Sequence, residues 1–250
     1  MIPSFRLDDK VVIVTGASKG LGRAMALGLA ESGAHIVVSS RKLDECEKVA
    51  AEIRALGRRA LAVACHVGDW DQCAALIDAT VAEFGRIDVL VNNAGIAPVP
   101  PSLAGITEDL YQKTLDVNLK GPLRLTALAA EHMAPGSTVI NISSKASLRP
   151  SPFTVVYAAA KAAQNALTKA AAQELGPRGI RVNSIVCGMF HTDSFHRSAP
   201  TDAAQAHLAK NVSLGRIADA DEIVGTAIYL ASDASSYLTG ELILLDGGGS

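Results

Sequence analysis

The chain of 250 residues is 49% hydrophobic and 19% charged, so it is long and apolar enough to bury a large core within one domain. Its formal net charge of −2 provides no electrostatic attraction for nucleic acid or for an anionic membrane. These values favour a small molecule as the partner.

The cysteines and the first residues indicate the cellular compartment. The cysteines form no C-x-x-C pair and have no histidine at zinc-finger spacing; they are Cys46, Cys65, Cys73 and Cys187. This pattern predicts free thiols in a reducing compartment and no metal site. The opening residues, MIPSFRLDDK, lack the apolar segment of a secretion signal. The uncharged stretch 89–107 contains prolines and two asparagines, which argue against a membrane helix. We therefore predict a soluble, cytoplasmic protein.

Residues 10–33 form the stretch around which the chain is organised. The apolar run Val11–Val14 is typical of a parallel strand buried on both faces, and helical spacing begins near residue 21. The turn between them holds Gly16, Gly20 and Gly22. Glycines let a phosphate approach the main chain, and the first turn of a helix attracts its charge. The turn predicts a dinucleotide pyrophosphate site, against the alternative of a tight strand-to-helix connection alone.

The rest of the chain alternates between strand-like and helix-like segments. Further strands are predicted at 35–39, 60–65, 87–91, 138–142, 180–185 and 241–245. Further helices are predicted at 43–56, 69–84, 107–133 with a kink at Gly121-Pro122, 153–175, 199–211 and 220–231. This alternation predicts an α/β fold, a Rossmann-type doubly wound sheet of seven parallel strands with helices on both faces. Residues 1–250 are expected to form a single dinucleotide-binding and catalytic domain, with a substrate lid at about 189–213.

Ligands of such sheets bind beyond the carboxyl ends of the strands. The positions that follow predicted strands are 16–22, Ser40-Arg41, His66-Val67, 92–95, Ser143-Ser144 and 187–192.

A tyrosine and a lysine follow the serine pair. Tyr157 and Lys161 are four residues apart on a predicted helix, so they share one face about 6 Å apart along its axis. Tyrosine, with an ordinary pKa of ~10, is a poor base, but a neighbouring ammonium group lowers that pKa. Such a phenol can donate a proton to a carbonyl oxygen that a serine hydroxyl holds. The spacing alone also suits an ordinary helix face with a lysine that reaches solvent.

Five motifs occur in register along the whole chain. They are TGASKGLG at 15–22, NNAG at 92–95, Asn118 in DVN, Ser144 thirteen positions before Tyr157, and YAAAK ending at Lys161. Together they resemble the short-chain dehydrogenase/reductase family. The resemblance implies Tyr157 as the general acid/base and Ser144, rather than Ser143, as the group that orients the carbonyl. It also implies that Lys161 binds the nicotinamide ribose and lowers the tyrosine pKa, and that the main chain of Asn118 holds a water of the proton relay.

The resemblance also implies a set of cofactor-binding residues: Gly16, Ser18, Lys19, Gly20, Leu21, Gly22, Ser40, Arg41, His66, Val67, Asn93, Ala94, Gly95, Tyr157, Lys161, Gly188 and Thr192. The NNAG segment is expected to line the adenosine ribose, and Thr192 to meet the carboxamide. Two residues depart from the family pattern. Cys187 stands where proline is usual, and His66 stands where aspartate is usual at the adenine.

The end of the second strand indicates which cofactor binds. An acidic residue there would bind both ribose hydroxyls and repel a 2′-phosphate, but this chain has Ser40 and Arg41. Because a guanidinium group matches a phosphate and Lys19 adds positive charge, we predict NADP(H) rather than NAD(H). The alternative is that Arg41 and Lys19 are ordinary surface charges. HIVVSSRK followed by ACHVG is also similar to the NADPH-dependent carbonyl reductases of the family.

The predicted function is hydride transfer between nicotinamide and a ketone, an aldehyde or a secondary alcohol. Substrate contacts are expected in the loops 96–102, 145–153 and 189–211. Two other classes are weighed against it. A non-catalytic NADP-binding sensor needs neither the phenol nor the ammonium group, and a methyltransferase on a similar sheet needs an acid where Ser40 stands.

The resemblance further implies a homo-oligomer, with a tetramer favoured. The alanine-rich face of the helix that carries Tyr157 would then pack against a partner subunit. The alternative is that these alanines pack only within their own subunit.

Overall fold

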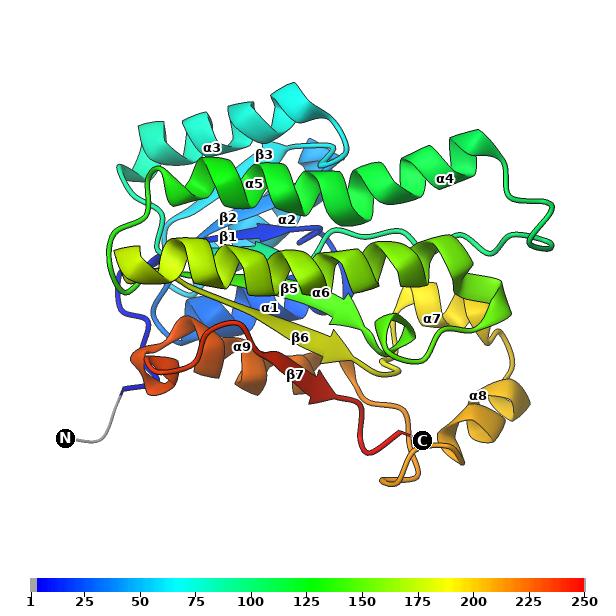
Figure 1. Ribbon diagram of the computed structural model, residues 1–250. Helices are drawn as coiled ribbons and strands as arrows, with labels where there is room; N and C mark the ends of the chain where they lie inside the picture. The colour runs from blue at the N-terminus through cyan, green and yellow to red at the C-terminus, as the bar shows by residue number, and fades with distance from the viewer. Residues whose placement is uncertain (1–3, 250) are drawn as a thin grey trace.

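The computed structural model describes residues 4–249 and contains a parallel sheet of seven strands in the order β3-β2-β1-β4-β5-β6-β7 (Figure 1). The strands are β1 (Val11–Thr15), β2 (His35–Ser40), β3 (Ala60–Ala64), β4 (Val89–Asn92), β5 (Thr138–Ser144), β6 (Arg181–Cys187) and β7 (Leu242–Leu245). The strand order changes direction between β1 and β4, which is where doubly wound sheets bind dinucleotides. The predicted fold class is confirmed.

Helices cover both faces of the sheet (Figure 1). One face carries α1 (Gly20–Glu31), α2 (Leu43–Ala55) and α9 (Val224–Ala231). The other carries α3 (Trp70–Phe84), α4 (Glu108–Leu115), α5 (Gly121–Ala130) and α6 (Val155–Leu175). Two short helices, α7 (Asp193–Ser198) and α8 (Asp202–Ala209), follow β6. Within residues 4–249, no helix combines the length and the apolar character needed to cross a bilayer.

The central strand β1 shows why the sheet is buried on both sides. Its side chains alternate between the faces, as in any strand. Val12 and Val14 pack into the core that contains Met25 of α1, and Ile13 packs into the core that contains Leu76 of α3. Two separate hydrophobic cores therefore hold the strand in register, and its carboxyl end is fixed between them.

The helix predicted at 107–133 is divided. α4 ends at Leu115, Asp116–Lys120 form a π turn, and α5 starts at Gly121 with Pro122 in its first turn. Proline lacks an N–H group and has a fixed φ, so it is well tolerated at the start of a helix. The predicted kink is in fact a π turn followed by a helix start.

The prediction of one helix at 199–211 was wrong in its extent, since the helix observed there, α8, covers Asp202–Ala209. α7 precedes it, and Pro200 separates α7 from α8 because the residue before a proline avoids the helical conformation. Each helix starts at a threonine whose hydroxyl accepts a backbone N–H, Thr192 from Phe195 and Thr201 from Ala204. These threonine caps are the sequence signals that the prediction overlooked.

Candidate active site

The carboxyl end of β5 and the first half of α6 bring the predicted catalytic side chains together. Ser144 is the last residue of β5 and pairs in register with Cys187, the last residue of β6. α6 packs against both β5 and the π turn that contains Asn118. Residues from four separate segments of the chain therefore meet at the carboxyl ends of the strands.

Tyr157 and Ser144 are in direct contact through a hydrogen bond between their side chains. Burial raises the pKa of Tyr157 to about 12, and the hydrogen bond with Ser144 acts in the opposite direction. The lowered pKa predicted from the neighbouring lysine is therefore not found, because burial removes the water that would stabilise the phenolate. The phenol is held in its protonated form, which is the form that donates a proton.

The two neighbouring serines have different surroundings. The hydroxyl of Ser144 contacts Tyr157 and accepts the backbone N–H of Ala146 at 3.2 Å. The hydroxyl of Ser143 is buried and donates instead to Ser147 Oγ at 3.5 Å. Only the second serine of the pair lies against the phenol.

Lys161 is anchored below the tyrosine and is only 3% exposed. Its Nζ donates to the carbonyl oxygen of Ile142 at 2.7 Å and to Gln164 Oε1 at 3.0 Å. Burial lowers the pKa of Lys161 to about 8. Nζ lies 6.0 Å from the centroid of the Tyr157 ring. Sequence reasoning missed the anchor Gln164, for which the only signal is its i+3 spacing from the lysine.

Asn118 is fully buried in the π turn, a feature that is frequent at functional sites. Its Nδ2 donates to the carbonyl oxygens of Ile96 at 2.8 Å and Thr114 at 2.9 Å, and its Oδ1 accepts the Ile96 N–H at 3.3 Å. A side chain on Gly95 would come within 2.9 Å of Asn118 Oδ1 and 3.8 Å of Lys161 Nζ. Asn118 thus ties α4 and α5 to the segment after β4, next to the lysine.

The glycine-rich turn has the geometry of an anion site. Gly16 has a φ of +65° and lies close to Ala94, and a side chain on Gly22 would come within 2.3 Å of the Gly16 carbonyl oxygen. Asn93 Nδ2 supports the turn by donating to Thr15 O at 2.8 Å. No side chain caps the N-terminus of α1, whose N-cap residue is Lys19. Its first N–H groups are therefore available to a phosphate.

The end of β2 presents Arg41 and two serines. Ser18 Oγ donates to Ser40 Oγ at 3.0 Å, so the glycine turn and β2 meet at these hydroxyl groups. Arg41 is exposed and makes no ion pair within residues 4–249. Lys19, which was expected to join it, instead forms an ion pair with Asp193 of α7 at 2.5 Å.

The remaining predicted residues lie near the glycine turn or after the carboxyl ends of β3 and β6. The methyl group of Thr192 is 3.5 Å from the position of a side chain on Gly20, which places the segment after β6 beside the glycine turn. Gly188 lies against the backbone of Asp246, where a side chain would come within 2.6 Å. Leu21, in the first turn of α1, is half-buried. After β3, His66 is exposed and Val67 is buried. Across residues 4–249, no group of three or more His, Cys, Asp or Glu side chains is arranged to hold a metal ion.

Comparisons with known proteins agree with this geometry. The family model described as Enoyl-(Acyl carrier protein) reductase matches residues 16–250. Dehydrogenase/reductase SDR family member 4 of Homo sapiens is 36% identical over 245 residues, which cover 97% of this chain and 88% of that protein. L-rhamnose 1-dehydrogenase (NAD(P)(+)) of Azotobacter vinelandii is 38% identical, with 97% of both chains covered. The chain belongs to the short-chain dehydrogenase/reductase family.

A solved structure of the short-chain dehydrogenase/reductase family extends the likeness to three dimensions. A gluconate 5-dehydrogenase from Burkholderia cenocepacia J2315, in complex with NADP and tartrate, superposes with a TM-score of 0.92 at 35% identity. The alignment covers 99% of this chain and 97% of that chain. The protein is thus an NAD(P)-dependent oxidoreductase of the short-chain dehydrogenase/reductase family.

Proposed function

We propose that this protein is an NADP(H)-dependent oxidoreductase that interconverts a ketone or aldehyde and the corresponding alcohol. The observation that carries the proposal is the hydrogen bond between Ser144 and Tyr157 above the buried ammonium group of Lys161. A proton donor, a second hydroxyl and a cation converge at the carboxyl ends of the strands, where doubly wound sheets bind their ligands. We further propose that residues 1–250 act as one domain, with residues 189–213 as its lid.

Each of the three side chains, Ser144, Tyr157 and Lys161, has a different role in the reduction. When bound, NADPH supplies the hydride. Ser144 donates a hydrogen bond to the carbonyl oxygen and fixes it beside the phenol, and Tyr157 donates its proton to that oxygen as negative charge develops there. Lys161 stabilises the phenolate that remains, because its charge lies 6.0 Å from the ring centroid. In the oxidation of an alcohol the same groups act in reverse order.

The residues of the crevice fit NADP(H). The uncapped N-terminus of α1 and the glycines at positions 16 and 22 suit a pyrophosphate. Ser18, Ser40 and Arg41 supply two hydroxyl groups and a guanidinium group for a 2′-phosphate, with no acidic residue at the end of β2 to repel it. The NADP found in the gluconate 5-dehydrogenase relative supports the same assignment.

Replacement of Arg41 by alanine is expected to lower kcat/KM for NADPH by about 10- to 100-fold while leaving that for NADH nearly unchanged, since a charge-assisted hydrogen bond to phosphate is lost. Steady-state kinetics with both cofactors measure the change. Lys19→Ala is the matched control, because Lys19 is paired with Asp193 and should contribute less. A variant Arg41→Ala that keeps the preference of the wild type for NADPH would contradict the assignment.

The lid and the loops around Tyr157 indicate a substrate of mixed polarity. The ring of His191 lies 5.8 Å from the centroid of Phe195 and 5.4 Å from that of His196. Relatives named for sugar substrates, the rhamnose and gluconate dehydrogenases, support polar ketones and secondary alcohols as candidates. Screening the purified protein by NADPH absorbance against such compounds tests the proposal. The rival non-catalytic sensor would bind NADPH and turn over none of them.

The rate of alcohol oxidation is expected to rise with pH. Oxidation needs the phenolate of Tyr157, and a pKa raised to about 12 leaves that form scarce at neutral pH. Up to about pH 8, where Lys161 keeps its charge, the phenolate fraction grows by about tenfold per pH unit, whereas the protonated form needed for reduction stays saturated. Profiles of kcat/KM against pH in both directions measure the difference. An oxidation rate that falls as the pH rises towards 8, in protein that stays folded, would contradict Tyr157 as the base.

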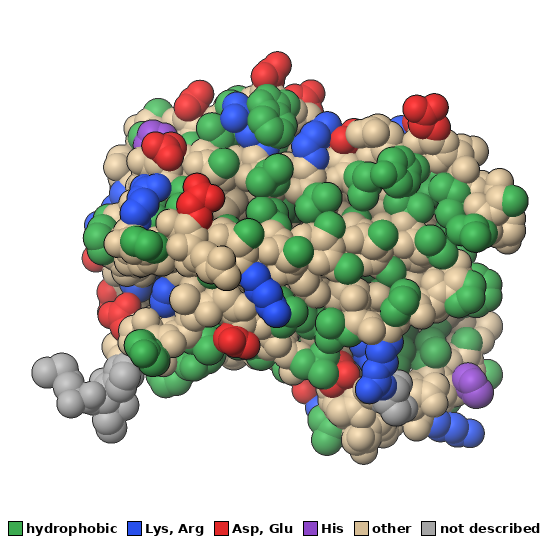
Figure 2. Space-filling model, in the orientation of Figure 1, with side chains coloured by type: hydrophobic (Ala, Val, Ile, Leu, Met, Phe, Trp, Pro, Cys, Tyr) green, Lys and Arg blue, Asp and Glu red, His purple; other side chains and the backbone are tan. Residues whose placement is uncertain are grey.

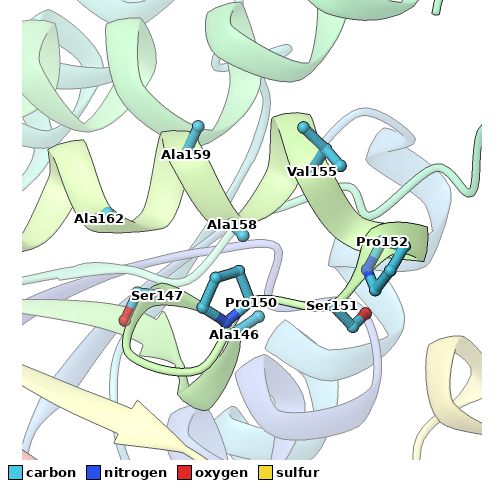
Figure 3. Close-up of a pocket in the computed structure, with 9 residues that line it drawn as sticks. All are labelled: Ala146, Ser147, Pro150, Ser151, Pro152, Val155, Ala158, Ala159 and Ala162. Carbon is cyan, nitrogen blue, oxygen red and sulfur yellow. The ribbon is translucent and has the colours of Figure 1, made fainter. Parts of the chain in front are cut away.

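We also propose that the protein forms a homo-oligomer through α6 and its neighbours. Of the alanines of α6, Ala158 and Ala160 are buried within the subunit, whereas Ala159 and Ala162 are exposed. The exposed pair belongs to a hollow of about 500 Å³ at the start of α6, lined also by Pro150 (Figure 3). None of the predicted catalytic residues lines this hollow, but five of its lining residues belong to the loop 145–153, in which substrate contacts were expected.

The surface around the hollow supports an interface between subunits. The face that shows α4, α5 and α6 carries many hydrophobic side chains and few charges (Figure 2). Large exposed hydrophobic residues of these helices and of the adjoining loops include Leu103, Tyr111, Leu123, Leu148 and Phe153. Extensive exposed apolar surface is typical of faces that bind another protein. Light scattering of the purified protein measures the oligomeric state, for which we favour a tetramer.

A further inference from the structure

Two cysteines with no part in the proposed reaction lie side by side at one edge of the sheet. Cys65 directly follows the edge strand β3, and Cys73 lies near the start of α3, which packs against β3 (Figure 1). Both side chains are buried, with exposed fractions of 3% and 0%. The two thiols are within hydrogen-bond contact of each other.

Further hydrogen bonds direct each thiol towards the segment that carries the other. Cys65 Sγ donates to the carbonyl oxygen of Gln72 at 3.4 Å, and Gln72 is the residue before Cys73. Cys73 Sγ donates to the carbonyl oxygen of Val67 at 3.2 Å, two residues after Cys65. Cys46 has a different environment, since its thiol reaches the carbonyl oxygen of Val63 only at 4.0 Å.

The surroundings of the pair lower the pKa of Cys73. A hydrogen bond with Cys65 is the largest cause, and Arg124 and Lys120 lower this pKa further. Burial and Asp69 oppose them. The position near the N-terminus of α3 acts in the same direction as the two basic residues. When Cys73 loses the proton that it donates to the Val67 carbonyl oxygen, its thiolate lies next to the thiol of Cys65, and a disulfide can form from this arrangement.

We propose that Cys65 and Cys73 form an oxidation site, at which a peroxide converts the two thiols into a reversible intrachain disulfide. The Cys73 thiolate attacks one peroxide oxygen, the O–O bond breaks, and a sulfenic acid forms at Cys73. The Cys65 sulfur then attacks the Cys73 sulfur, the S–S bond forms, and the hydroxyl group leaves as water. With hydrogen peroxide, the two thiols lose two electrons and two protons in all, and the oxidant is reduced to two water molecules.

The disulfide would change the segment that carries the predicted adenine contacts. It would close residues 66–72 into a ring and remove the thiol donors from the carbonyl oxygens of Val67 and Gln72. The Val67 carbonyl already lies against Gly121, where a side chain would come within 2.5 Å, so the segment has little room to move towards α5. We expect NADPH to bind about tenfold more weakly, the size of one or two lost hydrogen bonds. The expected loss of NADPH affinity rests on the proposed function, whereas the formation of the disulfide does not.

The test treats the purified full chain with hydrogen peroxide and maps its cysteines by mass spectrometry. We expect a peptide cross-linked between Cys65 and Cys73, lighter by two hydrogen atoms and restored by a thiol reductant. Cys46→Ala, which removes another buried thiol, should still form the cross-link. Cys73→Ala and Cys65→Ala should each abolish it, with circular dichroism to confirm folding. A cross-link that is absent from the folded wild type, or that joins Cys46, would overturn the proposal.

NADPH fluorescence titrations of the reduced and the oxidised protein form the second arm. A tenfold higher Kd after oxidation, reversed by the reductant and absent in folded Cys73→Ala, is the expected result. An unchanged Kd in protein that carries the disulfide would refute the coupling to the cofactor. If the reduced protein binds no NADPH, the proposed function is wrong. The disulfide is tested independently, by the mass-spectrometric mapping alone.

Discussion

Replacement of Tyr157 by phenylalanine is expected to lower kcat/KM for carbonyl reduction by about 10³-fold, because the phenol that is hydrogen-bonded to Ser144 and acts as the proposed proton donor is lost. The aromatic ring remains in place, so the packing of α6 against β5 should be retained. Initial rates of NADPH oxidation with the best substrate from the screen measure the effect.

Two controls separate lost chemistry from lost structure. The thermal midpoint of Tyr157→Phe should lie close to that of the wild type, and its Kd for NADPH should rise by no more than about tenfold, the size of one lost hydrogen bond from a cofactor-binding residue. Retention of most of the wild-type activity would exclude Tyr157 as the general acid and would leave the proposed mechanism without a proton donor.

Replacement of Ser144 by alanine is expected to cost about 10²-fold in kcat/KM, in the range found when one hydrogen-bond donor to a developing oxyanion is removed. The loss should fall mainly on kcat, because the hydrogen bond strengthens as charge develops on the oxygen. Ser143→Ala is the matched control, since that hydroxyl donates to Ser147 and not to the phenol.

The ratio between the two serine variants decides the assignment. Equal losses would indicate that both substitutions act through the fold of β5. A larger loss at Ser143 would reverse the assignment of the two hydroxyl groups. Thermal midpoints of both variants, measured beside the kinetics, show how much of each loss comes from altered stability.

Much of the fold follows from local patterns in the sequence. The run Val11–Val14 is apolar at every position because both faces of β1 are covered, and this pattern is readable without coordinates. The connection between α4 and α5 could not be predicted from such a pattern. The π turn at 116–120 depends on the hydrogen bonds between Asn118 and Ile96. Pro200 and the two threonine caps indicate separate helices α7 and α8, and the prediction overlooked these signals.

The site was predictable where side chains act through motifs, and less so where partners come from distant segments. Ser144 and Tyr157 are brought together as predicted. The raised pKa of the tyrosine was not foreseen, because burial depends on the whole surroundings and not on the spacing to Lys161. The ion pair of Lys19 with Asp193 joins residues 174 positions apart, so no local sequence pattern predicts it.

That ion pair joins two segments of the predicted cofactor site. It spans from the glycine turn to α7, and its side chains are 68% and 62% exposed, so it adds little to the free energy of folding. Screening by salt weakens such a contact further. The link between the glycine turn and α7 is therefore weak and can be broken by water and ions, without any change in the two hydrophobic cores that hold β1.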